Sequence, residues 1–187
     1  MRLGDLPGRI FLDTCVVNLI LDFGEQIHEG VVTPDGVSER TAGDIEALYN
    51  IFLVGQRAHW QLAVSPHTYQ EVIGTANPQR RRTLETWFFE LWRCWRDIID
   101  ADNDLPTFIE AEHLRVDLLS SDMLGVLPDL ADRVLVCDAV VYNCDLFCTR
   151  DWSTILRHRE QIKGLPFDIV SPAEWWDRIR PFAALFA

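Results

Sequence analysis

Residues 132–151 read DRVLVCDAVVYNCDLFCTRD, in which an apolar helix pattern is followed at once by an apolar strand pattern. The helix is expected to start after Leu127-Pro128 and to cover 128–143, and the strand ends on Asp151. A carboxylate at the carboxyl end of a buried strand opens into the crevice where sheets of alternating strands and helices hold their ligands. This stretch therefore predicts an α/β fold and one residue of its site.

A second apolar strand, 9–13, also ends on an acid, Asp13. Two such strand ends suggest one site, because the ligand crevice of these sheets lies outside the carboxyl ends of the strands. Carboxylates without a matching Lys or Arg repel one another, so the arrangement favours a hard divalent cation, Mg²⁺ or Mn²⁺, between them. The sequence therefore predicts a metal-dependent site.

The rest of the chain continues the alternation of strands and helices. Residues 24–43 are polar, contain several glycines and a proline and lack any period, so a long surface loop or insertion is expected there. The other expected elements are a helix over 15–23, a helix that Asp44 caps and that ends near 59, a strand over 60–65, helices that start at Ser65-Pro66 and Asn77-Pro78, a helix over 107–123, a strand over 167–170 and a helix over 173–185. This order predicts an α/β sandwich with a mostly parallel sheet, in one domain of residues 1–187.

Composition narrows the class of protein. With 187 residues, 48% hydrophobic and 25% charged, one globular core is expected, and no apolar run approaches the roughly 20 residues that a membrane span needs. The polar start, 1–8, lacks the apolar segment of a secretory leader, so a cytoplasmic protein with five reduced cysteines is expected. The net charge of -12 argues against a generally basic nucleic-acid surface but leaves room for a local phosphate-binding patch.

Four segments, in order along nearly the whole chain, resemble the motifs of PIN-domain ribonucleases of the VapC-like kind. Residues 132–151 resemble the family's acid, apolar helix, apolar strand and T-x-D signature. Residues 10–14, IFLDT, and 65–72, SPHTYQEV, resemble its first two motifs, and 167–175, FDIVSPAEW, resembles its last strand and P-x-E-[FW] helix. The resemblance implies a PIN-like three-layer α/β/α sandwich.

The resemblance also implies a function and a set of site residues. The expected activity is metal-dependent endonuclease cleavage of single-stranded RNA that leaves a 5′-phosphate and a 3′-hydroxyl, with one or two Mg²⁺ or Mn²⁺ ions activating a water. Small PIN domains commonly act as the toxin of a toxin–antitoxin pair, so an antitoxin protein is an expected partner. The acidic quartet would be Asp13, Glu71, Asp132 and Asp151, with Thr14 and Thr149 as supporting hydroxyls.

Each acid has an expected role. Asp13 and Asp151 are the expected direct ligands, Asp132 a ligand to the same or a second ion, and Glu71 a ligand or a base acting through water. Asp138 is the alternative third acid, but an offset of six residues turns it roughly 240° around the helix from Asp132, so both cannot face one ion.

The sequence also carries a departure from the family and candidate contacts for the substrate. Cys15 stands where many family members carry Asn or Ser, which is expected to remove a hydrogen-bonding group from the site. An aromatic stripe within 87–95 has the spacing of a helix core face, with a base-stacking platform or a homodimer face as alternatives. The candidate phosphate contacts are Arg150, Arg157, Arg159 and the run Arg80-Arg81-Arg82.

Other interpretations of the same residues stay open. Asp13 and Asp151 have the positions of helix N-caps, and Glu71 fits a solvated helix face. A second function is a catalytically degenerate PIN fold that binds RNA or protein. A third is a haloacid-dehalogenase-like phosphatase with a nucleophilic Asp13, although that motif needs an acid where Cys15 stands, and the only lysine, Lys163, follows the last acid.

Overall fold

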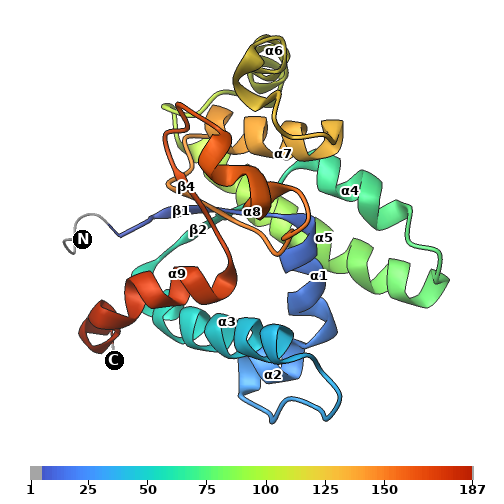
Figure 1. The fold of residues 1–187 in the computed structure, drawn as a ribbon, viewed down its shortest axis with the longest axis vertical. Coiled ribbons are helices and arrows are strands. Elements are labelled where there is room, and N and C mark those ends of the chain that lie inside the picture. Colours follow the sequence, from blue (N-terminus) through green and yellow to red (C-terminus); the bar gives the residue numbers. More distant parts are fainter. Residues whose placement is uncertain (1–5, 187) are drawn as a thin grey trace.

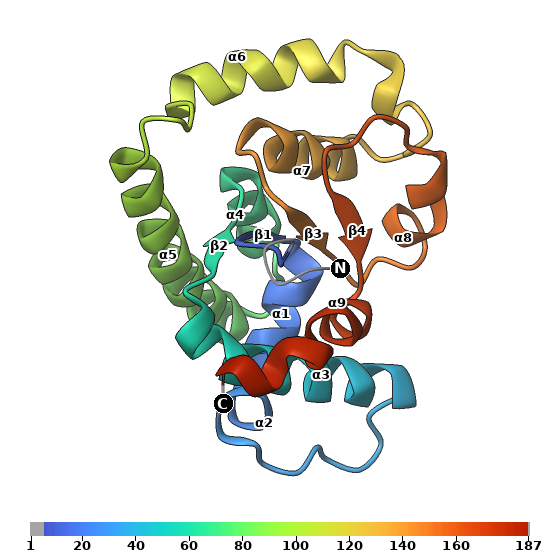
Figure 2. The same cartoon turned by 90° about the vertical axis from the view of Figure 1, so that its left-hand side faces the viewer.

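The computed structural model describes residues 6–186. Residues 1–5, on which part of the expectation about the polar start rests, and residue 187 lie outside the described part. The four strands described there pair in parallel in the order β2-β1-β3-β4, so the expected mostly parallel sheet is confirmed (Figure 2). They are β1 (Arg9–Leu12), β2 (Gln61–Ala63), β3 (Leu146–Cys148) and β4 (Asp168–Val170).

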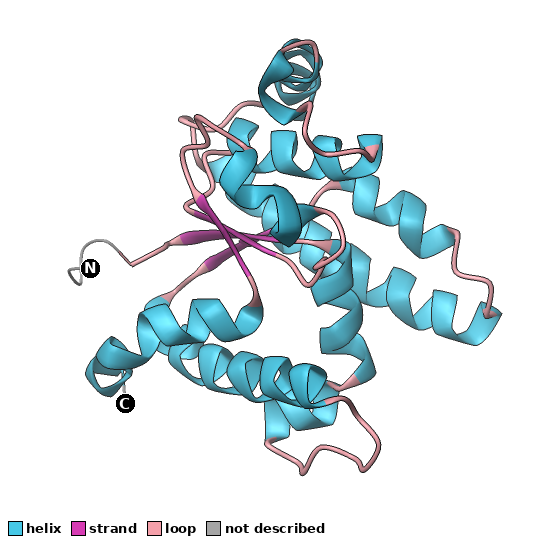
Figure 3. Cartoon of the chain, in the orientation of Figure 1, coloured by secondary structure: helices cyan, strands magenta, loops and turns pink. Residues whose placement is uncertain are grey.

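Helices cover both faces of this sheet (Figures 1 and 3). α1, α3 and α9 lie on one face, α4 and α7 lie on the other, and α6 lies outside α7. The α-helices of residues 6–186 are α1 (Thr14–Asp22), α2 (Gly24–Glu29), α3 (Glu39–Ala58), α4 (Pro66–Ile73), α5 (Pro78–Ala101), α6 (Phe108–Leu119), α7 (Leu130–Val141), α8 (Ile155–His158) and α9 (Pro172–Ile179).

Three helix starts follow from the capping residues that the sequence predicted. The Ser65 side chain accepts a hydrogen bond from the backbone N–H of His67, and the Asn77 side chain accepts two from the first turn of α5. Ser171 and Glu174 form a reciprocal capping box at α9. Proline at the first turn of α4, α5 and α9 costs no hydrogen bond because its missing N–H would have no helical partner there.

The expected long loop over 24–43 is wrong in its extent. Only residues 30–38 are non-helical, because α2 occupies the first part and α3 begins at Glu39, where the Ser38 side chain accepts from the N–H of Thr41. Gly30 ends α2 in the left-handed conformation, with φ of 70°. Asp44 is therefore an interior residue of α3 and not its cap.

The core is apolar and lies on both sides of the two central strands. Phe11 of β1 and Phe147 of β3 stack with ring centroids 5.2 Å apart, and both side chains are fully buried. The aromatic stripe of α5 is only partly a core face, because Phe88 and Trp95 are buried whereas Trp87 is 37% exposed. Within residues 6–186, no helix combines the length and apolar character needed to cross a membrane.

Candidate active site

The sheet order places a ligand crevice between β1 and β3. The chain leaves β1 toward β2 on one side and leaves β3 toward β4 on the other, which makes the carboxyl ends of these neighbours the topological switch point of the sheet. Asp13 directly follows β1, and Thr149 to Asp151 follow β3. The backbone N–H of Asp13 donates to the carbonyl of Cys148 at 3.0 Å, which fixes the acid at the end of the ladder.

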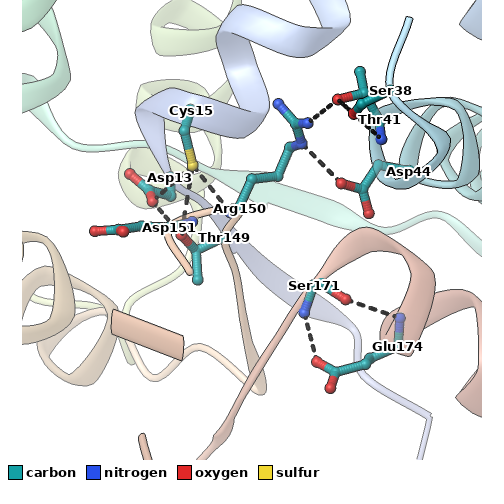
Figure 4. A network of polar contacts seen from close by, with 10 residues as sticks. All are labelled: Asp13, Cys15, Ser38, Thr41, Asp44, Thr149, Arg150, Asp151, Ser171 and Glu174. Carbon is teal, nitrogen blue, oxygen red and sulfur yellow. Dashed lines mark hydrogen bonds and ion pairs between the residues drawn. The ribbon is translucent and has the colours of Figure 1, made fainter. Parts of the chain in front are cut away.

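Asp13 is held by two neighbouring side chains (Figure 4). Its Oδ2 accepts hydrogen bonds from the hydroxyl of Thr149 and, at 3.0 Å, from the thiol of Cys15. The same sulfur accepts the backbone N–H of Arg150 at 3.0 Å. The expectation that Cys15 removes a hydrogen-bonding group is therefore wrong, because the thiol donates and accepts in the place of an amide or hydroxyl.

The charge of Asp13 is costly in this position. Burial raises the pKa of Asp13, hydrogen bonds from Cys15 and Thr149 oppose that rise, and the nearby charge of Asp151 adds to it. Only 5% of the Asp13 surface is exposed. A group that supplied positive charge at this point would therefore stabilise the ionised form.

Asp151 is fixed by the turn that follows it. Its Oδ1 accepts the backbone N–H groups of Ser153 and Thr154 at 2.8 and 3.0 Å and the Ser153 hydroxyl at 2.6 Å. Burial acts to raise the pKa of Asp151, but these hydrogen bonds outweigh it and lower the pKa. The N-cap interpretation of Asp151 is wrong in detail, because α8 begins at Ile155 with Thr154 as its N-cap, and Oδ1 of Asp151 instead closes the turn before that helix.

Thr154 joins Asp151 to Asp132, which lies in the first turn of α7. The Thr154 hydroxyl donates to Oδ2 of Asp132 at 2.7 Å and also contacts Oδ2 of Asp151. A hydroxyl has one hydrogen, so it cannot donate to both carboxylates at once. Burial raises the pKa of Asp132, the Thr154 hydrogen bond opposes that, and the charges of Asp151 and Asp13 add to the rise.

Glu71 completes the predicted quartet from α4. It is exposed by surface area, yet partial desolvation raises its pKa, the nearby Thr14 hydroxyl opposes that rise, and the charges of Asp13 and Asp132 add to it. Asp129, the N-cap of α7, also adds its charge to Glu71 and Asp132. This fifth acid was not predicted, although Asp directly before an apolar helix is a preferred N-cap residue.

Thr14 contributes an unsatisfied hydroxyl to the same place. The residue is 4% exposed, and its Oγ1 makes no hydrogen bond of ordinary geometry with the residues described. The Glu71 carboxylate, whose pKa this hydroxyl lowers, is its nearby acceptor, and a small shift of either side chain would complete the hydrogen bond.

Asp138 faces a different part of the molecule. It is fully buried, its Oδ1 lies 2.6 Å from Nη1 of Arg115 on α6, and its Oδ2 accepts the hydroxyl of Ser65. Burial raises the pKa of Asp138, and the hydrogen bond from Ser65 and the charge of Arg115 oppose that rise. The helix rotation that separated Asp132 from Asp138 in the sequence therefore agrees with the structure.

Three of the six predicted phosphate contacts are engaged by carboxylates. Arg150 turns away from Asp13, donating to Asp44 at 2.8 Å and to Thr41 at 3.0 Å (Figure 4). Arg80 pairs with Asp22, and Arg159 pairs with Glu174. Arg157 is exposed on α8. The guanidinium groups of Arg80, Arg150 and Arg159 thus have carboxylate partners within the protein and need no phosphate.

The donor set of the site suits a hard cation in kind. Asp13, Asp132 and Asp151 present carboxylate oxygens, which Mg²⁺ and Mn²⁺ prefer, and Thr14 adds an unsatisfied hydroxyl. In residues 6–186, however, no group of three or more His, Cys, Asp or Glu side chains is gathered closely enough to hold one ion. The carboxylates are instead linked through the hydroxyls of Thr149 and Thr154.

Comparisons with protein-family models, curated proteins and solved structures find no match for this chain. Two hollows of the molecule also lie away from the acids. One of about 530 Å³ is lined by paired ions that include Arg159 and Glu174, and one of about 960 Å³ lies between α6 and α7. None of the four acids lines either hollow. The candidate site is therefore located by the charges and hydrogen bonds of the acids and not by the size of a cavity.

Proposed function

We propose that the chain is a metal-dependent endoribonuclease with a PIN-like three-layer α/β/α fold that hydrolyses single-stranded RNA. The observation that supports the proposal is that Asp13 and Asp151 follow β1 and β3 at the switch point of the sheet, with Asp132 and Glu71 near enough for their charges to act on one another. Among the described residues, none of the four forms an ion pair with Lys or Arg. Neighbouring acids raise the pKa of Asp13, Glu71 and Asp132, although not that of Asp151, and carboxylates that repel one another in this way are expected where a divalent ion binds.

In this proposal the chain's residues bind and orient the reacting groups. Asp13 and Asp151 would hold Mg²⁺ or Mn²⁺, and Asp132 would hold the same ion or a second one. Such an ion, when bound, would supply a water of lowered pKa and positive charge for the scissile phosphate. Thr149 and Cys15 fix the orientation of Asp13. Glu71, exposed and with a raised pKa, accepts a proton from the attacking water.

One observation favours a second function, a degenerate PIN-like module that binds RNA or protein without cutting it. The carboxylates are linked through hydroxyls and are not gathered around one point. Nothing comparable favours the phosphatase, because Lys163 donates to the carbonyl of Glu160 at 2.6 Å and its only described partner is that carbonyl. An antitoxin partner, a homodimer and a cytoplasmic location stay predictions.

Binding of a divalent ion should stabilise the protein. At a hundredfold excess of Mn²⁺ over its dissociation constant, the free energy of unfolding should rise by about 2.7 kcal/mol. Scanning calorimetry in chelator and in Mn²⁺, together with cleavage of a labelled single-stranded RNA, tests the proposal. Stabilisation with cleavage supports the nuclease. RNA binding without either effect would favour the degenerate module.

Asp132→Asn should show whether the charge of Asp132 destabilises the metal-free protein or whether its side chain supports the fold. A carboxyl with a raised folded pKa destabilises the fold above that pKa, and the penalty disappears as pH falls through it. In chelator at neutral pH, the variant should therefore melt at the same temperature as wild type or higher, since an Asn oxygen still accepts from Thr154. Mn²⁺ should stabilise it by clearly less. The exposed Asp117→Asn is the control. A variant that melts several degrees lower in chelator would make Asp132 a structural residue.

A further inference from the structure

An exposed tryptophan lies directly after the last acid of the site. Trp152 follows Asp151 in the chain and keeps 39% of its surface exposed. The guanidinium of Arg40, in the first turn of α3, lies over the ring at 4.7 Å from its centroid. An exposed cation–π pair of this kind contributes only about 0.5–1 kcal/mol to the free energy of unfolding. The contact between Arg40 and Trp152 therefore does little to stabilise the fold.

The pair is held rigidly at the rim of the site. Arg150 ties the same loop to the same helix turn through Asp44 and Thr41 (Figure 4). Figure 1 shows the amino end of α3 on the side of the molecule toward which β1 runs into α1, which is the carboxyl side of the sheet. Trp152 and Arg40 therefore stand beside the strand ends that carry the acids.

Arg40 differs from the other arginines near the site in how its charge is used. Arg150 is paired with Asp44, and Arg159 with Glu174. The contact described for Arg40 is with an aromatic ring, which leaves its positive charge without a carboxylate in the described part of the chain. The chain has a net charge of -12, which repels phosphate in general. A cation without a carboxylate partner, such as Arg40, attracts an approaching phosphate locally.

We propose that Trp152 and Arg40 form a nucleobase subsite, which rests on the proposed function. A base of single-stranded RNA next to the scissile phosphate stacks on the exposed part of the Trp152 ring, and Arg40 contacts the adjoining phosphate. Aromatic stacking and arginine are the usual means of holding single strands without reading their sequence, and flipped or unpaired bases alone present a free face. Double-stranded RNA is therefore a poor ligand for this subsite.

The test measures binding of a fluorescein-labelled oligouridylate in chelator, by anisotropy, with single abasic positions moved along the strand. Trp152→Leu should weaken binding roughly tenfold, and Trp152→Phe should restore most of it. An abasic site at one position of the strand should weaken binding to wild type by a similar factor but should not weaken binding to Trp152→Leu further. A tryptophan with only a structural role would not give this dependence on one base. Ile109→Ala on α6, which removes an apolar side chain that is 74% exposed and lies outside the aromatic stripe, is the control and should bind like wild type.

The outcomes separate the two proposals. If Trp152→Leu binds like wild type, or if abasic and protein substitutions act independently, the subsite is wrong while the nuclease can stand. If wild type neither binds nor cuts single-stranded RNA, the proposed function fails and the subsite fails with it. Arg40→Gln should weaken binding several-fold and reduce its dependence on salt, since it removes one phosphate contact.

Discussion

Asp13→Asn and Asp151→Asn should each lower the rate of RNA cleavage in Mn²⁺ by roughly two to four orders of magnitude. Both acids stand at the switch point of the sheet, one after β1 and one after β3, and the proposed ion binds between them. An amide oxygen is a much weaker ligand than a carboxylate, so the loss falls on activation of water and on neutralisation of the phosphate.

Asp13→Asn should leave the fold intact, whereas Asp151→Asn removes a charge whose folded pKa is lowered and should cost some stability at neutral pH. Asn at position 13 can still accept from Thr149 and Cys15, and neutralising an acid whose folded pKa is raised removes a destabilising charge. Asp13→Asn should therefore lose activity while its melting temperature in chelator stays level or rises. Asp117→Asn, on the exposed face of α6, is the control for purification and trace nucleases. Turnover near that of wild type in either folded variant would exclude the proposed site.

The sheet and most helix starts could be predicted because their causes are local. Apolar runs at 9–13 and 145–151 give buried parallel strands, and Ser65-Pro66, Asn77-Pro78 and Ser171-Pro172 start helices by side-chain capping and a fixed φ. The error over 24–43 has a tertiary cause. Glycines and polar residues indicate a loop, but packing of α2 against α3, and of both against α1, overrides that local preference.

The acids of the site could be predicted, but their partners could not. Strand ends need only the sequence, and helix rotation indicates that Asp132 and Asp138 cannot face one ion, whereas the choice of Asp132 followed from the spacing to Asp151 that the family resemblance implies. Thr154 links Asp132 to Asp151, and Cys15 supports Asp13 through a thiol, which are contacts between side chains whose rotamers depend on the packed structure. Arg150 shows the same limit, since its choice of Asp44 over a phosphate depends on where α3 begins.

Arg115→Met should lower the free energy of unfolding by about 3–5 kcal/mol at neutral pH. The substitution removes the guanidinium that lies 2.6 Å from Asp138, and it leaves that carboxylate fully buried without an ion-pair partner. An unpaired buried charge destabilises a fold by more than a typical surface contact stabilises it. Since burial raises the pKa of Asp138, the penalty is present above that pKa and is relieved as pH falls through it. Urea unfolding at neutral and acidic pH should therefore show the deficit shrinking in acid.

Two further variants identify the cause of this deficit. Arg93→Met breaks an exposed ion pair with Glu90 and should cost less than about 1 kcal/mol. The double variant Arg115→Met with Asp138→Asn removes both buried charges and should recover a large part of the lost stability, because the uncompensated carboxylate is gone. A single variant that costs under 1 kcal/mol, or a double variant no better than the single, would show that α6 is not held to α7 by this pair. Ser65 hydrogen-bonds Asp138 and caps α4, so the same pair also supports the helix that carries Glu71.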